Sequence, residues 1–170
     1  MNKGFTMIEL LIVIAIISIL SSVVFLNWKS GEAGFALQNS AYKLSQDIRE
    51  MQEMAMEARE MDCGGGDTGL SFGVQFKSSW SYYLLFVDCN SNYRQDSGED
   101  FKIINFEKGV EISNLSPSSF FGIVFTPPDP ITYIKGSSSG TIAEIILSLE
   151  DYPSRQRTIT VNTSGMIEIK

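Results

Sequence analysis

Oxygen-bearing residues between 88 and 99 follow the spacing of a calcium-binding loop. The candidate ligands, at the ligating positions of such a loop, are Asp88, Asn90, Asn92, Arg94 (through its backbone carbonyl), Asp96 and Glu99. Hard oxygen donors in this order surround Ca²⁺, and the final glutamate binds through both of its oxygens. The loop departs from the pattern where Tyr93 replaces the glycine that permits a sharp turn. Because the same residue types favour a polar turn between strands without metal, both interpretations stay open.

Composition excludes several other chemistries. The 170-residue chain has no histidine, which removes Ser-His-Asp and Cys-His nucleophile systems and histidine-ligated zinc. Its formal net charge of −7 disfavours nucleic-acid binding, because phosphates require a surplus of lysine and arginine. The sequence contains no phosphate-binding loop, dinucleotide fingerprint or nucleophile elbow. We therefore expect no enzyme activity and no required cofactor, with calcium as the one ion to consider.

An apolar run from Phe5 to Leu26 occupies the N-terminal region and contains a single charge, Glu9. A helix of this length spans about 30 Å, the thickness of the hydrocarbon core of a bilayer. Lys3 precedes the run and favours retention of the leading end in the cytoplasm. A carboxylate inside a membrane segment is costly without a partner. A simple anchor or an uncleaved signal peptide leaves Glu9 unexplained, whereas a helix that packs against other helices uses it.

The segment Gly4-Phe5-Thr6-Met7-Ile8-Glu9-Leu10 resembles the N-terminal signal of type IV pilins and type II secretion pseudopilins. The resemblance implies that a prepilin peptidase cuts between Gly4 and Phe5, and that the new Phe5 amino group is methylated. It also implies that Glu9 neutralises the Phe5 amine of a neighbouring subunit, since the two buried charges are far less costly as a pair. The implied partners are other pilin or pseudopilin subunits, the peptidase, an inner-membrane assembly platform and, before assembly, membrane lipid.

A second apolar pattern extends the helix beyond the membrane segment. Residues spaced alternately by four and three positions predict one helical stripe: Leu37, Ala41, Leu44, Ile48, Met51, Ala55 and Ala58. The polar residues between them predict a solvated face: Gln46, Asp47, Arg49, Glu50, Glu53, Glu57 and Arg59. Four methionines are interpreted as packing residues instead of metal ligands: Met51, Met54, Met56 and Met61. Cys63 and the three glycines that follow it are expected to end the helix.

After residue 66 the sequence changes to short runs rich in β-branched and aromatic residues, separated by turn residues. The predicted strands are Leu70–Phe76, Trp80–Val87, Phe101–Phe106, Val110–Leu115, Phe120–Phe125, Thr141–Leu149, Arg157–Asn162 and Met166–Ile169. A long helix whose apolar stripe covers an antiparallel sheet is an α+β arrangement. We predict a leader at 1–4, a transmembrane or filament-core helix at 5–28 and a globular head at 29–170. Within this head we predict an amphipathic helix at 29–62 and a β-rich region at 67–170.

Two further segments narrow the resemblance. FVDCNSNYRQDSGED (86–100) and RTITVNTSGMIEIK (157–170) are similar to H-type minor pseudopilins and FimT-like minor pilins. Some FimT-like proteins end with a Gly-Arg-x-Arg pattern associated with DNA binding. The matching positions here are Gly165, Met166, Ile167 and Glu168. Because neither arginine is present, DNA binding is not expected.

The resemblance also implies a location. It places the precursor in the bacterial inner membrane as a single-pass protein whose head lies outside the cytoplasm, before it enters a pilus or pseudopilus. An oxidising compartment favours a disulfide between Cys63 and Cys89, the only cysteines, over a reactive thiol. The predicted function is that of a minor pilin or pseudopilin subunit. The alternative is a membrane-anchored, calcium-dependent binding or adhesion domain that does not polymerise.

Overall fold

The computed structural model describes residues 4–63, 68–128 and 131–170, and within the helix it describes no side chains between 23 and 30. The chain forms two compact units, the N-terminal unit (Met1–Phe35) and the head (Ala36–Lys170). Helix α1 (Met7–Met56) contributes residues to both units. The head therefore begins at residue 36, whereas the sequence predicted its start at residue 29.

The apolar stripe of α1 is buried in the head, as predicted. Its buried members, none more than 5% exposed, are Leu37, Ala41, Leu44, Ile48, Met51, Met54 and Ala55. The interpretation of the methionines as packing residues is therefore confirmed for Met51 and Met54, while Met61 is half-buried. It is wrong for Met56, which is 55% exposed. The reason is geometric, because five residues after Met51 the helix has turned about 140° away from the stripe.

The end of α1 corrects the prediction that it runs to residue 62. The helix ends at Met56, before the glycines, and Met61–Asp62 forms the short strand β1. The turn has two hydrogen bonds, from Arg59 N–H to the Met54 carbonyl (3.1 Å) and from Ala58 N–H to the Ala55 carbonyl (3.0 Å). Ala58 adopts a left-handed φ of 48° and lies exposed outside the stripe. These are the features of a Schellman motif, with alanine in the position that usually holds glycine.

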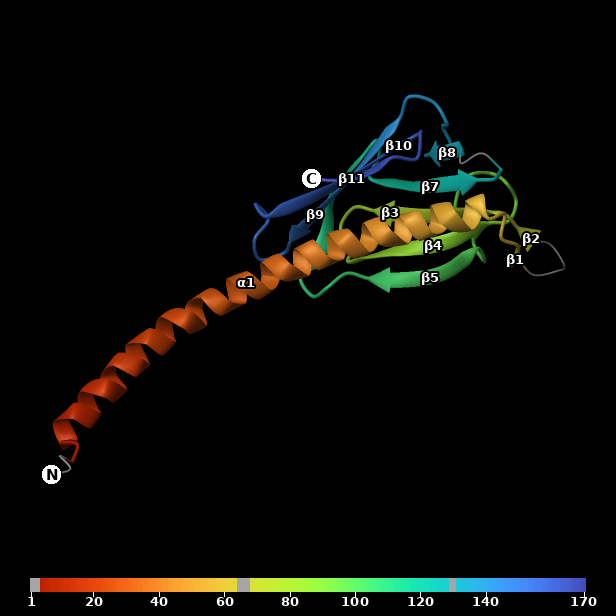
Figure 1. Cartoon of the computed structure of the whole chain (residues 1–170). Helices are drawn as coiled ribbons and strands as arrows, with labels where there is room; N and C mark the ends of the chain where they lie inside the picture. Colours follow the sequence, from red (N-terminus) through yellow and green to blue (C-terminus); the bar gives the residue numbers. More distant parts are fainter. Residues whose placement is uncertain (1–3, 64–67, 129–130) are drawn as a thin grey trace. The chain divides into compact units, whose positions relative to one another are not determined.

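A five-stranded antiparallel sheet has the strand order β5-β4-β3-β7-β8. Its strands are β3 (Ser71–Lys77), β4 (Tyr82–Asp88), β5 (Asp100–Asn105), β7 (Phe120–Thr126) and β8 (Ile131–Ile134). Figure 1 shows the head portion of α1 along β3 and β4. The hydroxyl of Tyr83 on β4 donates a hydrogen bond to Asp47 on α1, so this face of the sheet is the one turned to the helix.

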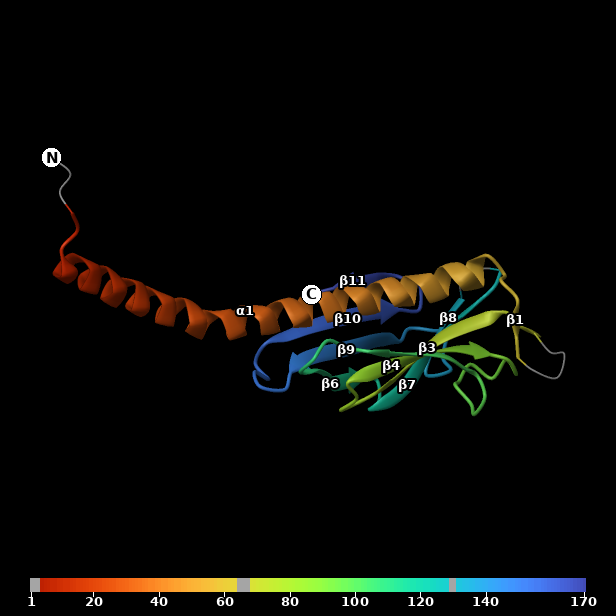
Figure 2. The same cartoon turned by 90° about the horizontal axis from the view of Figure 1, so that it is seen from below.

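The remaining strands form a second sheet and a small ribbon. The four-stranded sheet has the order β11-β10-β9-β6, with β6 (Val110–Ser116), β9 (Ile142–Leu149), β10 (Gln156–Asn162) and β11 (Ile167–Ile169). Strand β1 pairs with β2 (Thr68–Gly69). Figure 2 shows α1 beside β11, where Arg49 donates to the Ile167 carbonyl (3.4 Å) and Gln52 to the Gly165 carbonyl (3.3 Å). The α+β class is confirmed, but the strands divide between sheets, and β1, β2 and β8 were not predicted.

Candidate functional site

The start of α1 holds the predicted assembly residue Glu9 in a capping box. Thr6 immediately precedes the helix, and its N–H and hydroxyl both donate to Oε2 of Glu9, each at 2.8 Å. In return the Glu9 N–H donates to Oγ1 of Thr6 at 3.3 Å. This reciprocal arrangement satisfies N–H groups that the first helical turn leaves without partners. This cap was not predicted, although its signature, the Thr-x-x-Glu spacing, is present in the sequence.

The N-terminal unit leaves its apolar side chains uncovered. Every large apolar side chain described there from Phe5 to Leu20 is at least 48% exposed, and Phe5 itself is 87% exposed. Within the described residues no helix is both long and apolar enough to cross a membrane. The predicted membrane segment, 5–28, includes side chains from residue 23 onward that lie outside the described set. Gly4 and Phe5, on either side of the predicted cut, both precede the helix and are exposed.

Cys63 and Cys89 form a disulfide, as predicted, with their Cα atoms 5.9 Å apart. It joins the segment after β1 to the residue that follows β4. The bond therefore anchors one end of the predicted calcium loop to the chain that leaves the helix.

The two ends of that loop are closed by buried carboxylates. Asp88, 2% exposed, accepts hydrogen bonds from the backbone N–H groups of Asn92 (3.2 Å, Oδ1) and Tyr93 (2.8 Å, Oδ2). Glu99, 8% exposed, accepts from the N–H groups of Cys89 (3.0 Å, Oε1) and Asp96 (2.8 Å, Oε2). The loop is thus folded around its own acidic side chains.

Asp96 collects the two predicted amide ligands. Its Oδ2 accepts hydrogen bonds from Nδ2 of Asn90 (2.8 Å) and Nδ2 of Asn92 (2.6 Å), which lower the pKa of this carboxyl. The backbone N–H of Arg94 donates to Oδ1 of Asn92 at 2.9 Å. The structure therefore brings the predicted ligands together. Within the described residues, however, no group of three or more His, Cys, Asp or Glu side chains is placed to hold a metal ion. Calcium binding stays a prediction.

Tyr93 adopts the turn for which the calcium pattern uses glycine. Its φ is 63°, in the left-handed region that residues other than glycine rarely adopt. Its ring stacks on Tyr133 of β8, with centroids 3.8 Å apart and planes 7° from parallel. The side-chain hydrogen bond between Tyr133 and Tyr93 raises the pKa of Tyr133. This contact fastens the loop to the face of the five-stranded sheet turned away from the helix, and no local sequence pattern indicates it.

A polar cluster lies between α1 and β4. Asp47 is only 7% exposed, so its assignment to the solvated face was wrong. It accepts a hydrogen bond from the Tyr83 hydroxyl and lies 3.4 Å from the ammonium of Lys43. Burial, and then the bond to Asp47, raise the pKa of Tyr83. The cluster is missed by helix periodicity because its partner is 36 residues away in sequence.

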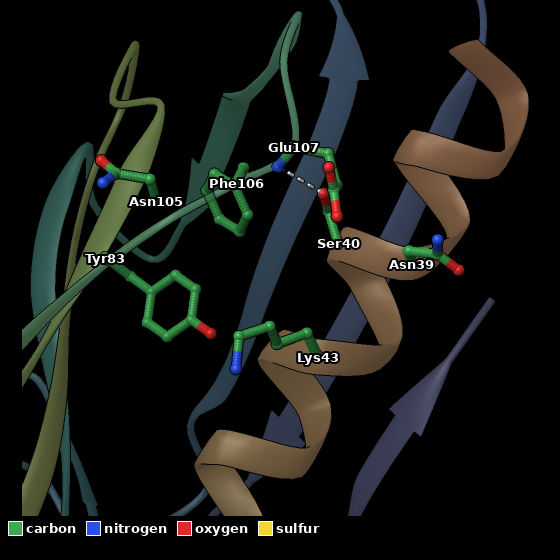
Figure 3. A pocket seen from close by; sticks show the side chains of 7 residues that line it. All are labelled: Asn39, Ser40, Lys43, Tyr83, Asn105, Phe106 and Glu107. Carbon is green, nitrogen blue, oxygen red and sulfur yellow. Dashed lines mark hydrogen bonds between the residues drawn. The ribbon is translucent and has the colours of Figure 1, made fainter. Parts of the chain in front are cut away.

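A small cavity adjoins this cluster, where Tyr83 and Phe106 face Ser40 and Lys43 of the helix (Figure 3). One wall is closed by a hydrogen bond from the Glu107 N–H to Oγ of Ser40 at 3.1 Å. The cavity measures about 30 Å³, a volume that suits a water molecule and excludes an organic ligand. It is a feature of packing and offers no substrate site.

Comparisons with known proteins agree with the motif and with the fold. A family model described as the prokaryotic N-terminal methylation motif matches residues 1–25. Two crystal structures of the type IV minor pilin FimU from Pseudomonas aeruginosa (strain PAO1) are similar to this chain. One aligns with a TM-score of 0.53 at 11% identity, over 79% of this chain and 92% of that one. The other aligns with a TM-score of 0.52 at 12% identity, over 79% and 87% respectively.

No curated protein matches the sequence significantly. The identity to FimU is low, so that likeness concerns the fold alone, and the methylation motif covers only the N-terminal region. The two findings are nevertheless independent, because one rests on residues 1–25 and the other on the arrangement of the helix and sheets. Together they show that the chain carries the prokaryotic N-terminal methylation motif and has a fold similar to that of a type IV minor pilin.

Proposed function

We propose that the chain is a minor pilin or pseudopilin subunit that a prepilin peptidase cuts between Gly4 and Phe5. The new Phe5 amine is methylated, and the subunit enters a type IV pilus or type II secretion pseudopilus through its N-terminal helix. Before assembly it resides in the inner membrane as a single-pass precursor with its head outside the cytoplasm. Its role is structural and requires no catalysis. The observation that carries the proposal is the methylation motif at residues 1–25, which ends in an uncovered apolar helix.

The capping box supports the proposed role of Glu9. Its Oε2 is held by Thr6, whereas among the described residues its Oε1 accepts no hydrogen bond. One oxygen therefore fixes the side chain at the helix start, and the other is available to the amine of a neighbouring subunit. A carboxylate in the first turn also interacts favourably with the helix dipole. An ammonium and a carboxylate that leave water together are far less costly than either alone.

Intact-mass analysis of protein extracted from the native membrane tests the processing step. The mature chain is expected to lack Met1–Gly4 and to carry one added methyl group on Phe5. In a strain without the prepilin peptidase, the full precursor mass is expected instead. A native mass that retains Met1 in the presence of the peptidase would contradict the proposal.

Variants of Glu9 distinguish the role of its charge from the role of its capping hydrogen bonds. Glu9→Gln keeps the geometry of a capping box, which accepts glutamine, but removes the charge. We expect both Glu9→Gln and Glu9→Ala to insert in the membrane and to be excluded from filaments in competition with wild type. Glu32→Gln is the matched control, since this acid is exposed on the same unit. Normal incorporation of Glu9→Gln would show that the cap, and not pairing with an amine, is what Glu9 provides.

We also propose that the loop 88–99 binds calcium. The oxygen-rich loop supports this, since Asp96 accepts hydrogen bonds from two amide side chains and its N–H donates to Glu99. A site of this charge has a Kd of about 10⁻⁴–10⁻³ M, so ten times that concentration of calcium stabilises the head by about 1.4 kcal/mol. The melting temperature of wild type should rise in calcium relative to chelator, whereas Asp96→Asn should lose the shift. Asp100→Asn is the control, and identical wild-type melting curves in calcium and chelator would leave a metal-free polar turn.

A further inference from the structure

The five-stranded sheet has a second face, turned away from α1, that is only partly covered. Residues directly opposite each other on paired strands share a face, and Tyr83 identifies the face against the helix. Gln75 of β3, opposite Gly122 of β7 and Leu84 of β4, therefore lies on the other face. The loop 88–99 covers part of that face through the Tyr93–Tyr133 stack.

Beside the covering loop this face contains a pocket of about 270 Å³. The residues that define it are Gln75, Tyr93, Arg94, Phe120, Gly122 and Lys135. They come from β3, β7, the loop and the turn after β8. The volume is about nine times that of the cavity beneath the helix (270 against 30 Å³), so a ring-sized group fits here.

The floor of the pocket carries an acceptor that no described protein donor occupies. Gln75 is 3% exposed, and its Nε2 donates to the Phe76 carbonyl at 3.3 Å. Among the described residues its Oε1 accepts no hydrogen bond. A Cβ at position 122 would lie 2.8 Å from that oxygen, so the glycine keeps the space before it open. This oxygen is therefore free to accept a hydrogen bond from a ligand that enters the pocket.

The wall of the pocket is aromatic. Phe120 is 50% exposed, and its ring meets the edge of Trp80 with centroids 6.3 Å apart. Tyr93 also lines the pocket and is fixed by its stack on Tyr133. Ring pairs prefer offset or edge-to-face contacts, and rigid aromatic walls favour a planar apolar group between them.

The rim of the pocket is positively charged on an acidic protein. Arg94 and Lys135 are both exposed, and neither lies within salt-bridge distance of a carboxylate in the described part of the chain. Lys135 is held next to the floor because its N–H donates to the Gly122 carbonyl at 3.0 Å. Asp96 is the one acid among the lining residues, so the pocket carries a net charge of +1 (two cations against one anion) while the whole chain carries −7.

From these features we propose that the pocket binds an aromatic ring that carries a hydrogen-bond donor at one end and a carboxylate at the other. The donor meets Oε1 of Gln75, the ring lies against Phe120, and the carboxylate meets Arg94 and Lys135 through charge-assisted hydrogen bonds. A small hydroxyaryl carboxylate and a tyrosine beside an acidic residue in a peptide share this chemistry. The site is separate from the N-terminal motif and does not depend on assembly.

The test uses the full chain in nonionic detergent, with NMR detection at the Gln75 side-chain amide and the Gly122 and Lys135 backbone amides. The probes are 4-hydroxyphenylacetate and the blocked peptide acetyl-Glu-Tyr-Glu-amide. The comparison ligands are phenylacetate, which lacks the ring donor, and 4-methylphenol, which lacks the carboxylate. We expect 4-hydroxyphenylacetate to bind at least about fivefold more tightly than either comparison ligand, because each lacks one polar contact.

The double variant Arg94→Gln/Lys135→Gln should weaken binding by about tenfold, since both side chains are exposed and the floor is untouched. Lys102→Gln/Lys108→Gln makes the same charge change outside the pocket and should bind as wild type does. Tighter binding of the peptide would assign the natural ligand to a partner protein, and tighter binding of the small acid to a free metabolite. Absence of saturable shifts up to about 20 mM of both probes, or equal affinity in the Arg94/Lys135 variant, would overturn the proposal.

Discussion

Helix α1 contributes to two units, which differ in whether its apolar side chains are exposed or buried. In the N-terminal unit the large apolar residues described from Phe5 to Leu20 are all at least 48% exposed. In the head, the stripe from Leu37 to Ala55 is at most 5% exposed. The head completes its own core, whereas the N-terminal unit presents an apolar surface of a size that soluble monomers rarely expose. Apolar periodicity therefore indicates that a helix will be covered, but not whether the chain itself supplies the cover.

Each unit also contains an acidic side chain that accepts a hydrogen bond from a hydroxyl group, but the two acids differ in burial. Glu9 is exposed and bonded to Thr6, three residues before it. Asp47 is buried and bonded to Tyr83 of another strand. The first contact is local and organises a helix end, whereas the second ties the helix to the sheet. Three sets of variants test how far this contrast holds.

The largest effect is expected from truncating apolar residues in each unit. Leu44→Ala removes a fully buried side chain and should lower the free energy of unfolding of the head by about 3 kcal/mol, through lost transfer energy and a cavity. Leu11→Ala, at a position 69% exposed, should leave that free energy unchanged. Urea unfolding of the full chain in detergent, followed by aromatic fluorescence, measures both. Equal losses for the two variants would break the comparison.

A smaller effect is expected from the buried acid. Tyr83→Phe removes the hydroxyl that donates to Asp47 and should destabilise the head by about 1–2 kcal/mol at pH 7. Thr6→Val removes the corresponding hydroxyl in the N-terminal unit and should leave unfolding of the head unchanged. Tyr42→Phe is the control within the head, since that ring is 51% exposed. A loss below about 0.3 kcal/mol in Tyr83→Phe would mean that Lys43 alone satisfies Asp47.

The same variant has a pH signature. The pKa of Tyr83 is raised above its ordinary value of 10.0, so the unfolded chain releases this proton first as pH increases. The stability that the neutral phenol contributes is therefore complete below pH 10 and is lost above it. The slope approaches about 1.4 kcal/mol per pH unit in wild type, and Tyr83→Phe should lack that slope. Unfolding free energies measured between pH 9 and 11 in both proteins test the sign.

The smallest effect concerns the end of the helix, where the cap is less favourable than the one at its start. Ala58→Gly should stabilise the head by about 0.5–1 kcal/mol, because glycine adopts the left-handed φ of this position without strain. Ala36→Gly, inside the helix, should do the opposite by about the same amount. Melting temperatures that fall in both variants would show that Ala58 makes a contact worth more than its backbone strain.

Local and periodic patterns in the sequence were enough to predict part of the structure. The N-terminal motif, the buried stripe, the α+β class and the disulfide were predicted, and most strands were placed within one or two residues. Prediction failed where long-range contacts decide the outcome. Asp47 is buried because of Tyr83, and the division of the strands into two sheets depends on pairings such as β3 with β7. β8 has only four residues, too few for an alternating pattern to identify it.

During synthesis, the contacts of α1 with the strands can form only in the order in which the partner strands appear. Asp47 meets Tyr83 once 36 further residues exist, while Gln52 and Arg49 meet Gly165 and Ile167 only after 113 and 118 more. At about 5–20 residues synthesised per second, the first contact is available within roughly 2–7 s and the others after roughly 6–24 s. A growing chain therefore carries a half-covered helix for several seconds. During that interval its apolar stripe is open to aggregation or to a chaperone, which makes the rate of synthesis a determinant of yield.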